Sequence, residues 1–143
     1  FIMGNVAGWT ADMLLKRGSS VTFVRKLMQS IGFFGAATFV SLVGYATTVP
    51  QAVTLMCCGL GLGAFALSGF GVNHLDIGPR YAGILLGFSN TAGTIPGILG
   101  VTLTGMILDA TGSWQLVFLI SAGIYVFGAI VWLLFATGER VFE

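Results

Sequence analysis

The sequence predicts an all-α integral membrane protein, and three observations support this fold class. Hydrophobic residues make up 56% of the 143 residues and charged residues only 8%, whereas about a quarter of the residues in soluble domains are charged. The mean hydropathy of +0.97 excludes a water-soluble core. Long uncharged runs alternate with short polar connectors, and a helix needs about 20 apolar residues to cross a bilayer.

Four of these runs are long enough to span a membrane. The expected spans cover residues 27–46, 51–71, 81–108 and 116–136, and residues 1–11 form the end of a preceding span. Pro50 separates the first two spans, because proline pushes the residue before it out of the helical region. Since the chain opens inside an apolar run and without a Met, we expect it to be the C-terminal helical bundle of a longer protein.

The span 81–108 has small and polar residues along one side. At helical spacing, one face carries Gly83, Gly87, Asn90, Gly93, Thr94, Gly97 and Thr104. Helices associate in lipid through small residues that let their backbones approach closely. An amide is costly against lipid, so we expect Asn90 to face protein or a water-filled cavity. Pro96 is either a kink in an over-long helix or a break that frees carbonyls to line a cavity.

The six basic residues predict the orientation of the chain. When successive connectors are assigned to alternate sides of the membrane, all six fall on one side: Lys16, Arg17, Arg25, Lys26, Arg80 and Arg140. Basic residues concentrate in cytoplasmic connectors. We therefore expect the C-terminus on the cytoplasmic side, or on the stromal side in a plastid. The net charge of +1 offers no basic surface for a nucleic-acid partner.

A glycine pattern and two cysteines lie within the second expected span. The string GLGLGA at 59–64 matches the spacing of a dinucleotide-binding loop, but that loop requires a preceding strand. Inside an apolar span, we interpret Gly59 and Gly63 as helix-packing residues. Cys57 and Cys58 are adjacent, and neighbouring cysteines rarely bridge each other. We expect both cysteines to be buried, as free cysteines usually are.

The sequence offers no combination of side chains that resembles an active site or a metal site. His74 is the only histidine, and it lies beside Asp76 in the expected connector 73–80. One His and one Asp are too few to hold a metal ion, and we expect a solvated or capping role for His74 rather than a proton relay. No nucleophile, base and orienting residue can be combined. We therefore predict neither catalytic residues nor a cofactor.

Several strings resemble a known family of membrane transporters. The string GWTAD at 8–12, followed by the pair Lys16-Arg17, resembles a loop motif of the major facilitator superfamily, although Leu15 stands where the motif has glycine. Three further strings resemble the anion/cation symporter family: SVTFVRKLMQSIGF (20–33), NHLDIGPRYAGILLGFSNTAGT (73–94) and FATGE (135–139). That family includes vesicular glutamate transporters, sialin and the plant plastid anion and phosphate transporters. These strings are most similar to those of the plant and algal members.

The resemblance implies the C-terminal part of a twelve-helix major facilitator fold, from the end of helix eight through helix twelve. In that superfamily, the aspartate of the loop motif, here Asp12, latches one conformation by engaging basic side chains. The candidate partners are Lys16, Arg17, Arg25 and Lys26, which fit a plain positive-inside anchor equally well.

The family also places a polar residue of the penultimate helix in the substrate cavity. Asn90 matches that position, with Ser89, Thr91 and Thr94 near it, and Ser68 in the preceding span. The family string at 73–80 supplies a connector signature of Asn73, His74, Asp76 and Arg80.

The expected spans lack charged groups for anion binding. No ionised side chain lies in 27–72, 81–108 or 110–138, yet an anion bound at mid-membrane needs a cation or several strong donors. We therefore expect the charged residues, including any site for a coupling Na⁺ or H⁺, in an N-terminal portion missing from this chain. The present residues would then form the second wall of the cavity.

The resemblance implies secondary active transport of an anion, either inorganic phosphate or a small organic anion, by alternating access coupled to sodium or protons. The expected partners are the anionic substrate, the lipid bilayer and the missing N-terminal half. The expected location is a plastid membrane, with another internal membrane or the plasma membrane as alternatives. Two other functions stay open: a non-transporting membrane scaffold or receptor on the same fold, and a passive anion channel.

Overall fold

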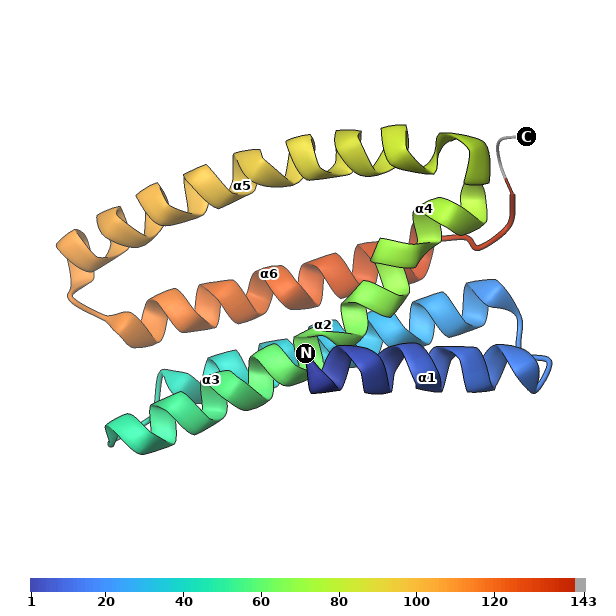
Figure 1. The fold of residues 1–143 in the computed structure, drawn as a ribbon. Helices are drawn as coiled ribbons and strands as arrows, with labels where there is room; N and C mark the ends of the chain where they lie inside the picture. Colours follow the sequence, from blue (N-terminus) through green and yellow to red (C-terminus); the bar gives the residue numbers. More distant parts are fainter. Residues whose placement is uncertain (141–143) are drawn as a thin grey trace.

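The computed structural model describes residues 1–140, and within that range every regular element is helical. The elements are α1 (Ile2–Lys16), α2 (Val21–Val43), α3 (Val49–Gly63), the π-helical turn η1 (Leu67–Gly71), α4 (Val72–Ile77), the 3-10 turn η2 (Pro79–Tyr81), α5 (Ala82–Thr111) and α6 (Trp114–Phe135). Four stretches of the described chain are long and apolar enough to cross a membrane: α2, residues 49–77, residues 79–111 and α6. The predicted fold class is confirmed, and each expected span corresponds to one of these stretches (Figure 1).

Local signals in the sequence explain where several helices begin and end. At the start of α2, Ser20 Oγ accepts a hydrogen bond from the Phe23 N–H, and at the start of α6, Ser113 Oγ accepts one from the Leu116 N–H. Such side-chain caps satisfy amide groups that the first turn of a helix leaves without partners. Gly112 ends α5 with a φ of +64°, a left-handed conformation that favours glycine.

Two connectors are shorter than the charges of the sequence predict. The connector expected at 12–26 is reduced to residues 17–20, and the connector expected at 73–80 is helical through α4. Both expectations assumed that ionised side chains need water. For Arg25 and Asp76 the structure shows the reason, because these two side chains bind each other across the two helical segments.

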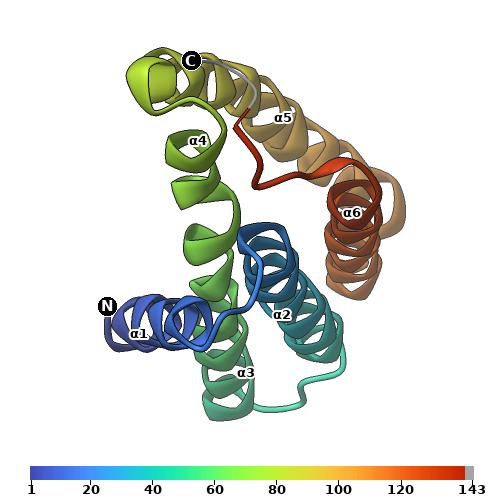
Figure 2. The same ribbon diagram turned by 90° about the vertical axis from the view of Figure 1, so that its right-hand side faces the viewer.

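The helix α2 lies at the centre of the bundle, with α3 on one side and α6 on the other (Figure 2). Glycines allow the close approach. A Cβ atom added to Gly32 would lie 2.7 Å from the Ala66 nitrogen, and one added to Gly35 would lie 2.8 Å from a side-chain carbon of Leu62. These contacts agree with the general dependence of helix packing in lipid on small residues.

The face that α3 turns to α2 contains Gly59 and not the neighbouring cysteines. Gly59 is buried, and a Cβ atom there would lie 3.1 Å from Phe39 Cβ. Cys57 and Cys58 are both exposed. The prediction that they are buried is therefore wrong for the described part of the chain, because the helix rotation that brings Gly59 against α2 turns both thiols away from it.

The helix α5 lies apart from the other helices along most of its length (Figures 1 and 2). Only its first residue, Ala82, is buried. The small and polar face of this helix, which was expected to pack closely against another helix, has no close neighbour at four glycines within residues 1–140. A Cβ atom added at any of these positions would meet nothing within 4 Å: Gly83, Gly87, Gly93 and Gly97. The predicted close approach of another helix to this face therefore has no counterpart among the described residues.

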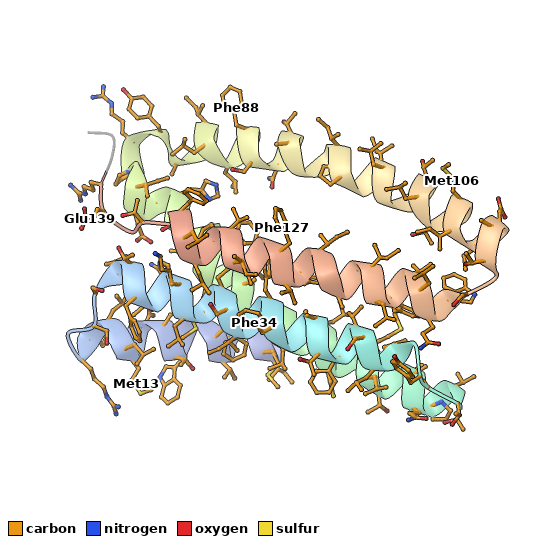
Figure 3. The ribbon with its side chains drawn as sticks, turned by 180° about the vertical axis from the view of Figure 1, so that it is seen from behind. Met13, Phe34, Phe88, Met106, Phe127 and Glu139 are labelled. Carbon is orange, nitrogen blue, oxygen red and sulfur yellow. The ribbon has the colours of Figure 1, made fainter. Side chains whose placement is uncertain are left out.

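The basic residues lie at one end of the helical bundle. The end of α1, the start of α2, the turn η2 and the C-terminal segment meet at that end, whereas the α2–α3 and α5–α6 turns lie at the other (Figures 1 and 3). This arrangement agrees with the one-sided charge pattern of the sequence. The side of the membrane that the basic end faces stays a prediction.

Candidate functional site

The candidate substrate residues lie on an exposed stretch of α5. Asn90, Ser89, Thr91 and Thr94 are all exposed. The three hydroxyls donate hydrogen bonds to carbonyls one helical turn earlier: Ser89 to Leu85, Thr91 to Gly87 and Thr94 to Asn90, each at 2.9 Å. The backbone of α5 therefore fixes the rotamers of these hydroxyls.

These hydrogen bonds decide what α5 can offer to an anion. A hydroxyl has a single proton; the hydroxyls of Thr91 and Thr94 have backbone carbonyls as partners, and that of Ser89 has the Leu85 carbonyl and His74 Nε2 within hydrogen-bond distance. An anion binds to donors. The Asn90 side chain carries two amide protons, and no group within residues 1–140 accepts either of them. Asn90 is therefore the residue of this stretch that can donate to an anion without breaking an existing bond.

The short helix α4 reaches α5 through His74. The Nε2 atom of His74 lies 2.8 Å from Ser89 Oγ, and its ring stands edge-on to that of Phe70, with 6.5 Å between the centroids. The Nε2 and Oγ atoms share a hydrogen bond whose direction depends on the tautomer of the imidazole. The other ring nitrogen is buried without a partner among the described residues. His74 thus connects α4 to α5, in place of the solvated or capping role expected.

Ser68 is separate from the other candidate substrate residues. It is 7% exposed and lies in η1, which packs against α1, α2 and α4. Its backbone carbonyl accepts a hydrogen bond from Arg25 Nη1 at 3.1 Å. The structure therefore does not bring Ser68 to the exposed stretch of α5, and this placement gives no support to its expected role in substrate binding.

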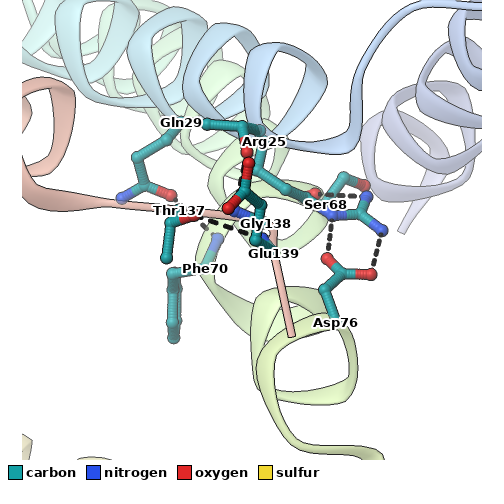
Figure 4. Close-up of polar contacts among 9 residues, drawn as sticks. Arg25, Gln29, Ser68, Phe70, Asp76, Thr137, Gly138 and Glu139 are labelled. Carbon is teal, nitrogen blue, oxygen red and sulfur yellow. Dashed lines mark hydrogen bonds and ion pairs between the residues drawn. The ribbon is translucent and has the colours of Figure 1, made fainter. Parts of the chain in front are cut away.

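Arg25 and Asp76 form a largely buried ion pair with two contacts (Figure 4). Arg25 Nε donates to Asp76 Oδ2, and Arg25 Nη2 donates to Asp76 Oδ1 at 3.2 Å. The side chains are 8% and 18% exposed. The planar guanidinium matches the geometry of a carboxylate, and each charge compensates the other where water is excluded. Arg25 was one of four candidate partners of Asp12, and in this structure its guanidinium binds Asp76 instead.

Asp12, Lys16 and Arg17 lie together at the C-terminal end of α1. They line a hollow of about 310 Å³ with Trp9 and Met13. Asp12 and Lys16 are one helical turn apart, but the one ion pair found within residues 1–140 is that of Arg25 with Asp76. The conformational latch expected at Asp12 therefore has no partner in the described part of the chain.

Three further predicted residues lie near the basic end. Lys26 follows Arg25 on α2, and its carbonyl accepts a hydrogen bond from the Ser30 hydroxyl at 2.7 Å. Arg80 is exposed in η2. Asn73 is 7% exposed in α4, and its Oδ1 atom is buried without a partner among residues 1–140. Of these three, Asn73 is therefore the one enclosed by the protein.

Gln29 is a polar residue of this region that the sequence interpretation missed. It is 2% exposed, and its Oε1 atom accepts a hydrogen bond from the Phe70 N–H in η1 at 3.2 Å (Figure 4). A π-helical turn changes the regular i→i−4 bonding of an α-helix and often lies at a functional site. The signal that could have indicated Gln29 is its amide inside an apolar span, since such groups are expensive in a membrane and need partners.

Pro96 lies inside α5 without ending the helix. With Gly97 and Thr104 it lines one side of a cavity of about 620 Å³ between α5 and α6, and Ser121 lies on the opposite side. The proline therefore faces a space between two helices, and its ring removes one backbone hydrogen bond there. The expected choice between a plain kink and a cavity-lining break stays open.

Few residues of the described chain are available to hold a metal ion or a coupling cation. Within residues 1–140, no three His, Cys, Asp or Glu side chains come together as a metal site would require. Both oxygens of Asp76 already accept hydrogen bonds from Arg25. A coupling Na⁺ would therefore have to compete with a guanidinium for this carboxylate.

Comparison with known proteins gives relatives for nearly the whole chain, although no protein-family model matches it. The "Ascorbate transporter, chloroplastic" of Arabidopsis thaliana is 51% identical over 142 residues, which cover 99% of this chain and 26% of the relative. The "Sodium-dependent phosphate transport protein 1, chloroplastic" of the same plant is 50% identical over 142 residues, covering 99% of this chain and 28% of the relative. The "Probable anion transporter 5" of Arabidopsis thaliana is 42% identical over 154 residues, covering the whole chain and 36% of the relative. The chain thus spans about a quarter to a third of the length of the curated relatives that it matches.

Proposed function

We propose, from the homology of this chain over its full length with one part of the plant anion and phosphate transporters, that it forms one portion of a membrane transporter for a small anion. Inorganic phosphate and a small organic acid such as ascorbate are the substrates that the names of the relatives suggest. The single observation that carries this proposal is an identity of about half the residues across 99% of the chain.

The geometry supports a contribution of α5 to the substrate path. Asn90 has free amide donors on an exposed stretch, while the neighbouring hydroxyls donate to the backbone. An amide alone does not balance the charge of an anion. We infer that positively charged side chains from another part of the transporter share the substrate with Asn90, and that this chain supplies a polar wall.

We propose alternating access as the mode of transport, with sodium or protons as the coupling ion. The name of one relative includes a dependence on sodium, which favours Na⁺ as the first ion to test. We further propose a plastid membrane as the location, because several relatives are chloroplastic. The basic end of the bundle would then face the stroma, since basic residues concentrate on the side that does not require translocation.

Reconstitution of the complete transporter in liposomes tests this function. Labelled phosphate and labelled ascorbate are offered separately, with an imposed sodium gradient, an imposed proton gradient or neither. Accumulation above equilibrium under one gradient supports coupled transport. Passive flux that ignores both gradients supports a channel instead, and binding without flux supports a scaffold or receptor.

The role of Asn90 is tested by Asn90→Ala in the same liposomes. We expect uptake to fall about tenfold or more, because a donor to a charged group contributes on the order of 1.5–3 kcal/mol. Thr102→Ala is the matched control, because Thr102 lies on the same helix and its hydroxyl donates to the Ile98 carbonyl. Unchanged uptake kinetics in Asn90→Ala, with the protein correctly inserted, would remove Asn90 from the site.

A further inference from the structure

The short helix α4 has few attachments to the rest of the bundle. Of its six residues, only Asn73 is buried. Its neighbours are η1 before it, η2 after it and the start of α5, and it does not run along α2. The position of α4 is therefore set at a small number of points.

The turn before α4 is clamped to α2 by two side chains. Arg25 and Gln29, one helical turn apart on α2, bind the Ser68 carbonyl at 3.1 Å and the Phe70 N–H at 3.2 Å. Gly69 lies between these two bonds, where an added Cβ would be 2.6 Å from Gln29 Oε1 and 2.9 Å from the Gln29 nitrogen. These two hydrogen bonds hold one side of the π-helical turn η1 against α2, and α4 begins immediately after η1.

The guanidinium of Arg25 binds both η1 and α4. Its Nη1 holds the Ser68 carbonyl, and its Nε and Nη2 hold the Asp76 carboxylate. Asp76 lies in the same turn of α4 as His74, whose ring binds Ser89 on α5. A continuous series of contacts therefore leads from α2 through α4 to the exposed stretch of α5.

We propose that Arg25 is a positioning residue for the substrate wall: it fixes the angle of α4 about the hinge η1, and α4 in turn sets the position of Ser89 and its neighbours on α5. This inference rests on the proposed transport function for its kinetic consequence, but not for its structural one. When the Arg25–Asp76 pair is absent, α4 pivots at η1 and moves His74 relative to α2, so that the part of α5 that carries Ser89 moves with it.

The structural consequence is tested by distance measurements between spin labels in the complete transporter in lipid nanodiscs. The labels are placed at Leu75 on α4 and Phe34 on α2, both exposed, in a background in which the exposed Cys57 and Cys58 are replaced by serine. We expect Arg25→Gln and Asp76→Asn to shift or broaden the distance between α2 and α4. A second label pair at Phe34 and Phe127, exposed on α2 and α6, is the control and should keep its distance. An unchanged distance between α2 and α4 in both variants overturns the proposal.

The kinetic consequence is tested by uptake of labelled inorganic phosphate, normalised to the amount of folded transporter. We expect Arg25→Gln to raise KM about five- to tenfold, within the range of coupling between linked sites, and Arg25→Lys to have a smaller effect. Loss of a merely structural anchor would lower the yield of folded protein and leave KM of the remaining molecules unchanged. That result would overturn the positioning role.

A double variant separates positioning from stability more sharply. Replacement of a buried ion pair by apolar side chains often preserves or improves stability, so Arg25→Met combined with Asp76→Leu is expected to fold. It cannot reproduce the two-point contact that fixes α4, and we therefore expect KM to stay raised. A return of KM to the wild-type value would overturn the proposal. If the wild-type protein shows no uptake at all, the transport function fails, and the spin-label distances still decide whether Arg25 positions α4.

Discussion

Arg25 and Asp76 are 51 positions apart in the sequence, and they form a two-point ion pair that joins the second helix to the short α4. The same guanidinium binds the Ser68 carbonyl in the π-helical turn. Three parts of one side chain therefore organise a region in which the backbone departs from regular α-helical bonding.

Removal of one member of the ion pair should destabilise the protein. Asp76→Asn leaves a guanidinium that is 8% exposed without its counter-charge, and such a change costs about 3–5 kcal/mol in fully buried pairs. We expect a loss near the lower bound because Asp76 is 18% exposed. Thermal unfolding of the purified transporter in detergent measures the effect. Asp109→Asn, an exposed carboxylate in the last turn of α5, is the control and should shift the midpoint little; equal shifts in the two variants would contradict the prediction.

A methyl group at Gly69 should disturb the crossing of η1 and α2. The added Cβ would lie 2.9 Å from the Gln29 backbone nitrogen, which cannot move away as a flexible side chain could. We expect Gly69→Ala to cost about 1–3 kcal/mol, as overpacking does in a well-packed core. Gly71→Ala is the matched control, since a Cβ there meets nothing within 4 Å. The yield of monodisperse protein and the unfolding midpoint compare the two variants, and equal behaviour would show that the crossing is looser than the structure has it.

The cap of α2 should contribute measurably to stability. Ser20 Oγ accepts the Phe23 N–H, and loss of such a cap costs about 1 kcal/mol. We expect Ser20→Ala to lower the unfolding midpoint and Ser20→Asp to retain it, because a carboxylate accepts the same hydrogen bond and is favoured at a helix N-terminus. Ser19→Ala, one residue earlier, serves as the comparison. The expectation fails if the two alanine variants unfold at the same temperature.

The glycine stripe of α5 should matter only in the complete transporter. Gly87 has no neighbour within 4 Å of an added Cβ among residues 1–140, yet its face is small and polar in a segment that is otherwise apolar. If another helix of the transporter packs closely there, Gly87→Leu should reduce uptake strongly, because small residues permit that approach. Ala92→Leu makes the same kind of change on the opposite face of α5 and should be tolerated. Equal uptake by the two variants would mean that no helix approaches the stripe.

Hydropathy was sufficient to predict the four membrane-length helices, because a run of about 20 apolar residues has few other stable states. The ends of helices that carry charges were harder to predict. The charges of Arg25 and Asp76 both predicted solvated connectors, and only the three-dimensional structure shows that the two side chains bind each other. The π-helical turn has no periodic signal in the sequence, so neither the place of Ser68 in this turn nor the contact of Gln29 with it could be predicted. The stretch around Asn90 lies within a membrane-length helix as expected, but it is exposed among residues 1–140, so its expected position facing protein or a water-filled cavity stays a prediction. The contact of His74 with Ser89 could be found only from the structure.

The C-terminal segment returns to the start of α2, where the Gly138 N–H donates to Thr22 Oγ1 at 2.9 Å across 116 positions of sequence. There is no room for a side chain at this point, since a Cβ on Gly138 would lie 2.8 Å from the Thr22 nitrogen. The second and last helices are thus fastened to each other both along their packed sides and at their basic ends. If the chain were cut once in the exposed turn between α2 and α3, the piece that contains α2 would stay bound to the piece that contains α6 through these contacts. The two pieces should therefore purify together.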